Sequence, residues 1–497
     1  MYASKSMKIL WKCVSAATLA FALTACSTTP PPSVKAKDMP KSFAAPISAA
    51  AENQITTEWW KSFSSPELTG FIDEAYKGNL DLAAAAARVR QAQAQVGIST
   101  ASLLPSAGVT GSAQRAGTRT TAYNTFGLTG AASYELDVWG QNINSMRASR
   151  FSSRAALYYE DTIRLTTEAT VANTYFSVLA LRERIAVARR NVEAAKRILS
   201  ITQAKVTNGV LSNLELAQQT AQVLGEEAAI PRLEELEREQ LNALAVLLGR
   251  MPGTLKVEGT GLDGLVAPPV QAGVPSLLLT RRPDVAQAEA AMLAAHADLD
   301  VARAAFLPAV DLTARGGWSS AVFDGLVSPG NLAWSIGASA LQTIFDGGRL
   351  TSQRDYYKAR EAELVANYRA AVLSALSDTE TQLGSVASYS DQEYLVSEQA
   401  KNAAEAFRIS ELQYREGVID LLTVLQAQQT LFSAQDALIQ IKLARLQSGV
   451  GLYRALGGGW TVESDKDKSL RNTFVPVPDL TDLPIGVPFE LTSANPY

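Results

Sequence analysis

The sequence has few of the side chains on which catalytic and metal sites depend. Its 497 residues include a single histidine, His296, and two cysteines, Cys13 and Cys26. The chain therefore has too few histidine and cysteine residues for a metal cluster, or for serine–histidine or cysteine–histidine catalysis. We expect no catalytic residue, no metal and no cofactor, and we predict that the protein is not an enzyme.

Basic runs and long apolar runs are also scarce. No run of lysine and arginine suggests a nucleic-acid surface, and the formal net charge is −4. Beyond the N-terminus, no stretch approaches the roughly 18 consecutive apolar residues that a transmembrane helix needs. A hydrophobic content of 47% excludes a disordered chain. We therefore expect a folded protein without a nucleic-acid partner, which could cross a membrane only as strands.

The N-terminus has the pattern of a cleaved export signal. Lysines precede an apolar run from Cys13 to Ala25 that is too short to span a bilayer and suits a signal-peptide core. The run ends in Leu23-Thr24-Ala25-Cys26, which resembles the lipobox of bacterial lipoproteins. That resemblance implies a signal peptide over 1–25, acylation of Cys26, a tether over 26–58 and, from Ser27, sorting to the outer membrane. The alternative is an ordinary signal peptide that ends at a chance cysteine.

The chain beyond the tether is an internal duplication. Asn208-Gly209-Val210-Leu211 aligns with Glu416-Gly417-Val418-Ile419, at the same offset that relates Trp139-Gly140-Gln141 to Gly347-Gly348-Arg349. Each copy is predicted to contain an alanine-rich helix, a short β region, one very long helix, a glycine turn and a return helix.

A long helix over roughly Gln141–Val206 sets the shape of the first copy. The segment has no internal proline or glycine, and at 1.5 Å per residue it is about 100 Å long. Apolar residues repeat every seven positions, with a second stripe beside them: Val171, Val178, Ile185, Val192, Leu199 and Val206, then Leu181, Ala188 and Ala195. A sustained heptad is typical of coiled-coil packing. An ordinary two-stranded coiled coil is the alternative, but the alanine content and the return helix favour many helices side by side.

The return helices are predicted over roughly Asn213–Leu248 and Asp420–Leu456, each after a glycine turn. Pro231 lies inside the first of them and is predicted to kink or break it. The second copy has no proline at this place, so we expect the two halves to differ there.

Between these helices the hydrophobic pattern changes from heptads to alternation. Even positions are mainly apolar and odd positions mainly polar in 125–138, 310–319 and 331–338. Such segments are typical of transmembrane β-barrels, although a soluble sheet with one buried face gives the same local pattern. We predict two β-hairpins, over 105–140 and 308–348.

Four strands per chain cannot close a barrel by themselves. Open sheet edges are not tolerated in lipid, and outer-membrane barrels begin at about eight strands. Two chains would give eight strands with a filled interior, whereas three would give twelve, enough for a pore. Three chains, as a homotrimer, are favoured if the protein transports solutes, and two chains are the alternative.

These features resemble the TolC-like outer-membrane efflux proteins, in particular the lipoprotein (NodT-like) branch. The matching residues include Trp59-Trp60, Asn79-Leu80-Asp81-Leu82, Phe345-Asp346-Gly347-Gly348-Arg349 and Leu248-Gly249-Arg250. The resemblance implies an α+β membrane protein, in which a trimeric outer-membrane β-barrel of twelve strands continues into a long coiled-coil α-helical barrel in the periplasm.

The same resemblance implies a function and partners. It implies a passive duct that exports small molecules or drugs as the outer-membrane component of a tripartite efflux pump. The implied partners are a periplasmic adaptor (membrane fusion protein), an inner-membrane resistance-nodulation-division pump and outer-membrane lipid. The implied location is the cell outer membrane, with a lipid anchor and most of the chain in the periplasm.

We divide the rest of the chain by the duplication. First-repeat helices and equatorial segments are expected over 59–104 with 141–275, and second-repeat helices over 276–307 with 349–459. The tail over 460–497 is expected at the equatorial belt.

The turns after the long helices are the predicted functional sites. By resemblance, the second-copy turn forms the periplasmic entrance, with Tyr414, Arg415, Asp420, Thr423 and Gln426 as gate residues. The adaptor-contacting turns are predicted at Asn208, Gly209, Val210, Gly417 and Val418. Thr423 and Gln426 are neutral at positions where some family members carry aspartate rings. A threefold ring of Asp420 held by Arg415 is one interpretation, and a helix N-cap at Asp420 is the other.

Two other functions are compatible with parts of this pattern. The first is the outer-membrane duct of a type I protein secretion system, and the second is a periplasmic coiled-coil adaptor or scaffold lipoprotein. The alternating segments argue against a scaffold, which needs no lipid-facing β surface, and the lipobox with the branch resemblance favours efflux.

Overall fold

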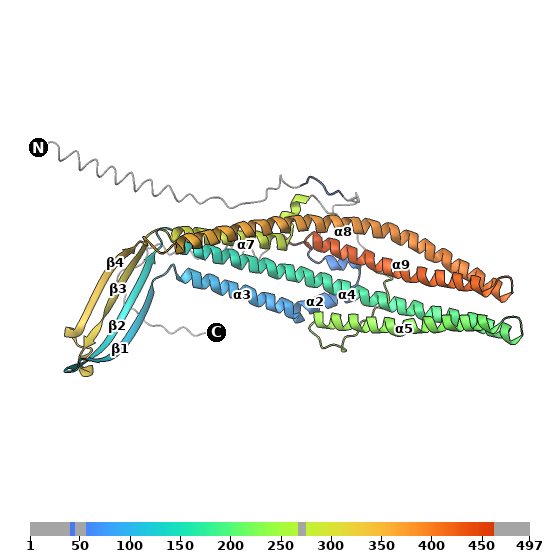
Figure 1. Ribbon diagram of the computed structural model, residues 1–497, viewed down its shortest axis with the longest axis horizontal. Coiled ribbons are helices and arrows are strands. Elements are labelled where there is room, and N and C mark those ends of the chain that lie inside the picture. Colours follow the sequence, from blue (N-terminus) through green and yellow to red (C-terminus); the bar gives the residue numbers. More distant parts are fainter. Residues whose placement is uncertain (1–39, 45–55, 267–274, 462–497) are drawn as a thin grey trace.

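The structure is a computed structural model that describes residues 40–44, 56–266 and 275–461. Figure 1 shows an elongated chain with a sheet at one end and two helical turns at the other, joined by helices that run along the long axis. The predicted signal peptide, Cys26, most of the tether and residues 462–497 lie outside the described residues.

Both copies contain the same order of elements, as the duplication predicts. The first copy consists of η2 (Trp59–Phe63), α2 (Pro66–Gly78), α3 (Leu80–Ala101), β1 (Ser106–Gly117), β2 (Ala122–Leu136), α4 (Gln141–Thr207) and α5 (Asn213–Leu247). The second consists of η3 (Pro275–Leu277), α6 (Leu278–Arg281), α7 (Pro283–Ala304), β3 (Ala309–Ser320), η4 (Phe323–Gly325), η5 (Pro329–Asn331), β4 (Leu332–Leu341), α8 (Arg349–Arg415) and α9 (Leu421–Ala455).

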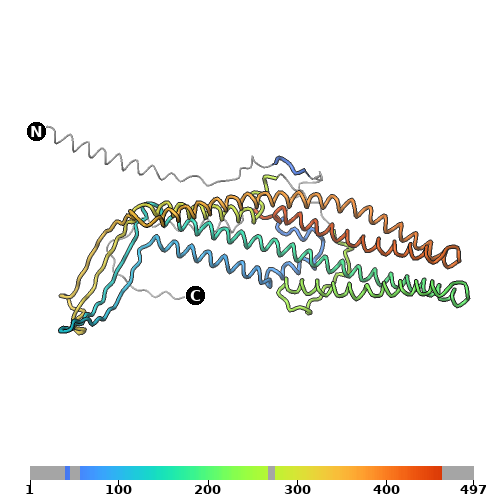
Figure 2. Tube along the Cα trace, viewed as in Figure 1, coloured from blue at the N-terminus to red at the C-terminus, as the bar shows by residue number. Residues whose placement is uncertain are grey.

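The long helices and their return helices agree closely with the predicted ranges. α4 and α8 each contain 67 residues, and α5 and α9 each contain 35. Figure 2 shows each pair as a hairpin whose turn lies at the end opposite the strands. Within the described ranges, no helix is both long and apolar enough to cross a membrane.

Of the two predicted effects of Pro231, the break is wrong. α5 continues as a single helix through this residue and has the same length as α9. Pro231 lies on the exposed side of α5, where water can satisfy the carbonyl that loses its hydrogen bond. Two residues further on, Leu233 is buried with Leu181 and Ile185 of α4, so α5 stays packed on α4 beyond the proline.

The heptad positions of α4 form the predicted packing face. Val171, Val178, Ile185 and Val192 are buried, while Leu199 and Val206, nearest the turn, are half-buried. The second stripe is buried as well. α4 packs along α3, α5, α7 and α9, so the stripes serve several neighbours rather than one coiled-coil partner.

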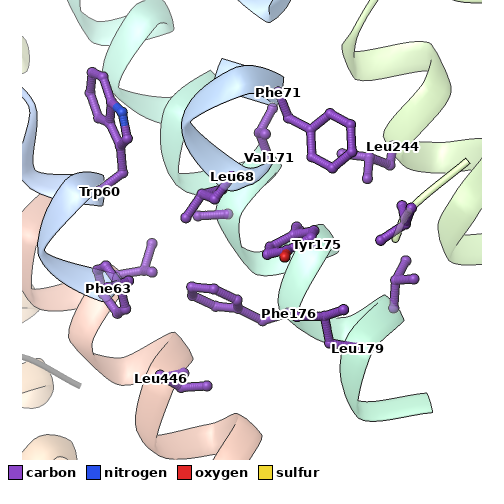
Figure 3. Close-up of a cluster of buried hydrophobic side chains, with 14 of the residues drawn as sticks. Trp60, Phe63, Leu68, Phe71, Val171, Tyr175, Phe176, Leu179, Leu244 and Leu446 are labelled. Carbon is purple, nitrogen blue, oxygen red and sulfur yellow. The ribbon is translucent and has the colours of Figure 1, made fainter. Parts of the chain in front are cut away.

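The largest core lies midway along the molecule, where η2 and α2 pack on α4 (Figure 3). Phe63 contacts Phe176 with ring centroids 5.3 Å apart, and Phe71 contacts Tyr175 at 5.7 Å. α2 begins here because Ser65 accepts a hydrogen bond from the Leu68 amide and Pro66 suits the first helical turn. Each fully buried aromatic or leucine side chain contributes about 1.5–3 kcal/mol, so this core fixes the short N-terminal helices to the long one.

The two copies also connect their short and return helices in the same way. The Asn79 side chain, which starts α3, donates to the carbonyl of Leu247 at 2.9 Å. Arg282, which starts α7, donates to the carbonyl of Ala455 at 3.2 Å. These side chains satisfy carbonyls that each return helix leaves open at its C-terminal end.

The strands form one antiparallel sheet in the order β1-β2-β3-β4. Its register places apolar residues opposite one another, such as Leu128 with Trp318 and Trp318 with Leu332. Polar residues share the other face, as Ser133 with Thr313 does. The alternation therefore predicted the two faces correctly. Trp334 is 75% exposed on the apolar face, which indicates a surface that is covered in the working protein.

Candidate functional site

The two turns at the helical tip have the same backbone geometry. Gly209 has φ 73° and Gly417 has φ 79°, the left-handed conformation that glycine adopts without strain. The next amides, of Val210 and Val418, each donate back to a carbonyl near the end of the long helix at 2.9 Å. The repeated Gly-Val pair therefore ends both helices by the same hydrogen-bond pattern.

Both turns present an apolar side chain to solvent. Val210 is 69% exposed and Val418 is 71% exposed. The two valines occupy equivalent positions of the duplication, so each chain exposes two equivalent apolar side chains at the tip.

Asp420 is the N-cap of α9. Its carboxylate accepts hydrogen bonds from the Thr423 amide at 2.9 Å and from the Thr423 hydroxyl at 2.7 Å. Those bonds from Thr423 lower the pKa of Asp420 below its usual value. The N-cap interpretation is therefore correct for the chain. Arg415 does not hold Asp420 within the chain, because its guanidinium pairs with Glu416 at 3.3 Å.

Tyr414 connects the two helical hairpins. It is 1% exposed, and its hydroxyl lies 2.9 Å from the Thr202 hydroxyl of α4. The Lys205 ammonium lies 4.4 Å from the centre of the Tyr414 ring and also donates to the Tyr414 backbone carbonyl. Burial raises the pKa of Tyr414, so the phenol stays neutral at physiological pH.

Ion pairs extend this connection away from the tip. Arg197 of α4 pairs with Glu411 of α8 at 3.3 Å, and Arg184 of α4 pairs with Asp436 of α9 at 2.6 Å. The partners of Tyr414 were absent from the predicted gate residues. The sequence did contain a sign of Thr202. This residue follows Ala195 by seven positions, so it is a polar residue at a position of the second stripe that is otherwise apolar.

Thr423 and Gln426 lie on the exposed side of α9, away from the buried Leu421 and Val424. Of the predicted gate residues, only Tyr414 is buried and joins one hairpin to the other. Within the described ranges, no group of three or more histidine, cysteine, aspartate and glutamate side chains could hold a metal ion.

Two long helical hairpins at one end and a sheet with an exposed apolar face at the other define the subunit of an outer-membrane duct. The chain belongs to the outer membrane efflux protein family, whose sequence model matches residues 71–250 and 274–458.

Curated relatives and solved structures agree with this assignment. The chain is 39% identical over 457 residues to the pyoverdine export outer membrane protein OpmQ of Pseudomonas aeruginosa, covering 89% of this chain and 96% of the relative. It is 30% identical over 462 residues to the probable efflux pump outer membrane protein TtgC of Pseudomonas putida, covering 90% and 95%. The CmeC outer membrane channel of Campylobacter jejuni has a TM-score of 0.83 at 27% identity, covering 90% and 98%.

The family, the fold class and the efflux function predicted from the sequence are confirmed. The protein is an outer-membrane efflux channel with the α+β fold of the trimeric channels, in which each chain supplies four strands. The predicted gate, the adaptor-contacting turns and the domain boundaries stay predictions.

Proposed function

We propose that this chain is the lipid-anchored outer-membrane duct of a tripartite efflux pump, with a periplasmic adaptor and an inner-membrane resistance-nodulation-division pump as partners. The observation that carries the proposal is the helical tip, where two equivalent turns expose Val210 and Val418 beside the Tyr414 connection. Identity of 39% to a pyoverdine export protein favours a pyoverdine-like metabolite as cargo. Export of such a metabolite by cells with and without the gene tests the proposal.

The proposed adaptor contact gives the first prediction. Val210→Asp combined with Val418→Asp places a charge at each apolar point, so we expect at least a tenfold loss of adaptor affinity, about 1.4 kcal/mol. The measurement is binding of the purified trimer to the cognate adaptor. Val246→Asp is the matched control, because Val246 is 61% exposed but lies near the other end of its hairpin. Unchanged affinity of the double variant would move the adaptor contact away from the turns.

The position of Phe43 supports the proposed lipid anchor. Phe43 is buried against Tyr368 and Val372 of α8, 17 residues after Cys26. From Val372 to Arg349, where α8 starts beside the sheet, the helix rises about 35 Å. The 17 residues that follow Cys26, up to Phe43, reach at most roughly 60 Å when fully extended. This reach exceeds the helix rise of about 35 Å, so an acyl group on Cys26 can lie at the membrane next to the sheet.

The lipid anchor gives the second prediction. Cys26→Ser is expected to abolish incorporation of labelled palmitate, because the thiol is the attachment point, whereas Cys13→Ser keeps the label. Autoradiography of the immunoprecipitated protein measures both variants. Label that persists in Cys26→Ser would contradict acylation at this residue.

A further inference from the structure

The polar face of the sheet carries charges at two separate levels. Glu135 of β2 lies opposite Asp311 of β3, near the end of β2 that leads to α4 and the start of β3 that follows α7. Arg315 lies four residues further along β3 on the same face, about 13 Å away at a rise of 3.3 Å per residue. At physiological ionic strength the Debye length is about 8 Å, so the acidic and basic levels act separately on a passing solute.

Arg315 stands alone among small side chains. Its cross-strand partners are Ala131 of β2 and Ser335 of β4, and Gly317 follows it on the same face of β3. A side chain at Gly317 would collide with the Leu128 carbonyl oxygen, which would lie 2.3 Å from its Cβ. Because residue 317 is a glycine, no side chain fills the space beside Arg315 on this face.

Arg315 is exposed, and none of the described carboxylates pairs with it. Within the described ranges, Arg315 takes part in no hydrogen bond or ion pair. On the polar face of the described strands, the nearest carboxylate to Arg315 along β3 is Asp311, about 13 Å away. The side chain is therefore free to bind a ligand.

In the trimeric fold the apolar face, with Trp334 and Ile336 exposed, turns to lipid, and the polar face lines the interior of the shared barrel. Three copies of Arg315 then lie at one height around the pore. A guanidinium presents a planar fork of donors that matches carboxylate and phosphate oxygens, so three of them suit a polyvalent anion.

We infer that Arg315 forms a threefold guanidinium ring inside the barrel, which selects solutes that carry carboxylate or phosphate groups on their way out. The ring is a specificity-determining site of the export channel. The Glu135 and Asp311 level, nearer the helices, attracts cations and acts at a different height of the pore.

The test is block of the current through single trimers in a planar bilayer by hexacyanoferrate, added on the side of the β-hairpin turns. In about 0.1 M salt, we expect Arg315→Gln to raise the half-blocking concentration at least tenfold, and Arg315→Lys to restore most of the block, since the charge returns. In about 1 M salt the wild-type block should weaken strongly, because the Debye length falls to about 3 Å. Size-exclusion chromatography verifies that each variant remains a trimer.

Arg115→Gln is the matched control. Arg115 lies opposite Asn124, so it belongs to the apolar face of the same sheet, and its replacement should leave the block unchanged. Block by hexaamminecobalt should persist in Arg315→Gln and weaken in Glu135→Gln combined with Asp311→Asn. Equal hexacyanoferrate block of wild type and Arg315→Gln would overturn the proposal, as would an equal loss of block in Arg115→Gln.

Discussion

Replacing Tyr414 with alanine is expected to raise the single-channel conductance of the purified trimer several-fold. The substitution removes the hydroxyl contact with Thr202 at 2.9 Å and the ring beneath the Lys205 ammonium. A hydrogen bond contributes about 1 kcal/mol and a cation–π contact about 0.5–2 kcal/mol, so each chain loses about 2 kcal/mol of connection between its hairpins. In a concerted opening three chains lose it together, and about 5.5 kcal/mol suffices to turn a 1:99 equilibrium into 99:1.

The control variants separate a lost connection from a lost side chain. Phe407→Ala removes a buried aromatic ring of the same helix. Phe407 contacts the ring of Phe432 in its own hairpin and shares a cluster with Ile198 of α4, but its side chain has no polar group that could bond to the other hairpin. Its conductance should stay near the wild-type value. Tyr414→Phe keeps the ring and loses only the hydroxyl contact, so an intermediate conductance is expected. If intact Tyr414→Ala trimers conduct like the wild type, Tyr414 is a core residue rather than part of the gate.

The sequence predicted the repeated, long elements well because their signals are cumulative. A heptad sustained over α4 and an alternation sustained over β2, β3 and β4 each repeat the same physical requirement many times. The turns at 209 and 417 require a positive φ, which glycine adopts without strain and other residues adopt rarely. The two glycines therefore marked the turns correctly.

Single residues were harder to predict, because their effect depends on neighbours that are distant in the sequence. Pro231 is tolerated because its side of α5 faces solvent and Leu233 packs on α4. The direction of the Arg415 side chain decides that it pairs with Glu416, and spacing along the chain does not specify that direction. Tyr414 was predicted as a gate residue, but its contact with Lys205 joins residues 209 positions apart.

A buried glutamate offers the second large effect. Glu168 of α4 is 5% exposed and accepts hydrogen bonds from the Trp59 indole at 3.0 Å and the Tyr76 hydroxyl at 2.7 Å. Burial raises the pKa of Glu168 to about 7, and the two hydrogen bonds offset only part of that rise. The carboxylate joins η2 and α2 to the long helix, so its ionisation acts on the contact that fixes the N-terminal helices.

The sign of the pH dependence follows from the raised pKa. The folded state binds the Glu168 proton more tightly than the unfolded state, whose glutamate has a pKa near 4.5. The stabilising contribution is therefore complete below pH 4.5 and is lost as the pH rises through 7. At 1.36 kcal/mol per pKa unit, the loss approaches about 3 kcal/mol per chain by pH 8.

Glu168→Gln is therefore expected to raise the unfolding temperature at pH 8 and to change it little at pH 5. Glutamine keeps an oxygen that accepts from Trp59, and its amide can donate to Tyr76, without a charge that burial penalises. Thermal unfolding of purified trimers between pH 5 and 8 measures the difference between the variant and the wild type. Glu239→Gln, which changes an exposed glutamate of α5, should keep the wild-type dependence. A Glu168→Gln trimer that is less stable than the wild type at pH 8 would show that the buried carboxylate is stabilised as an ion, and that its contacts with Trp59 and Tyr76 outweigh the cost of its burial.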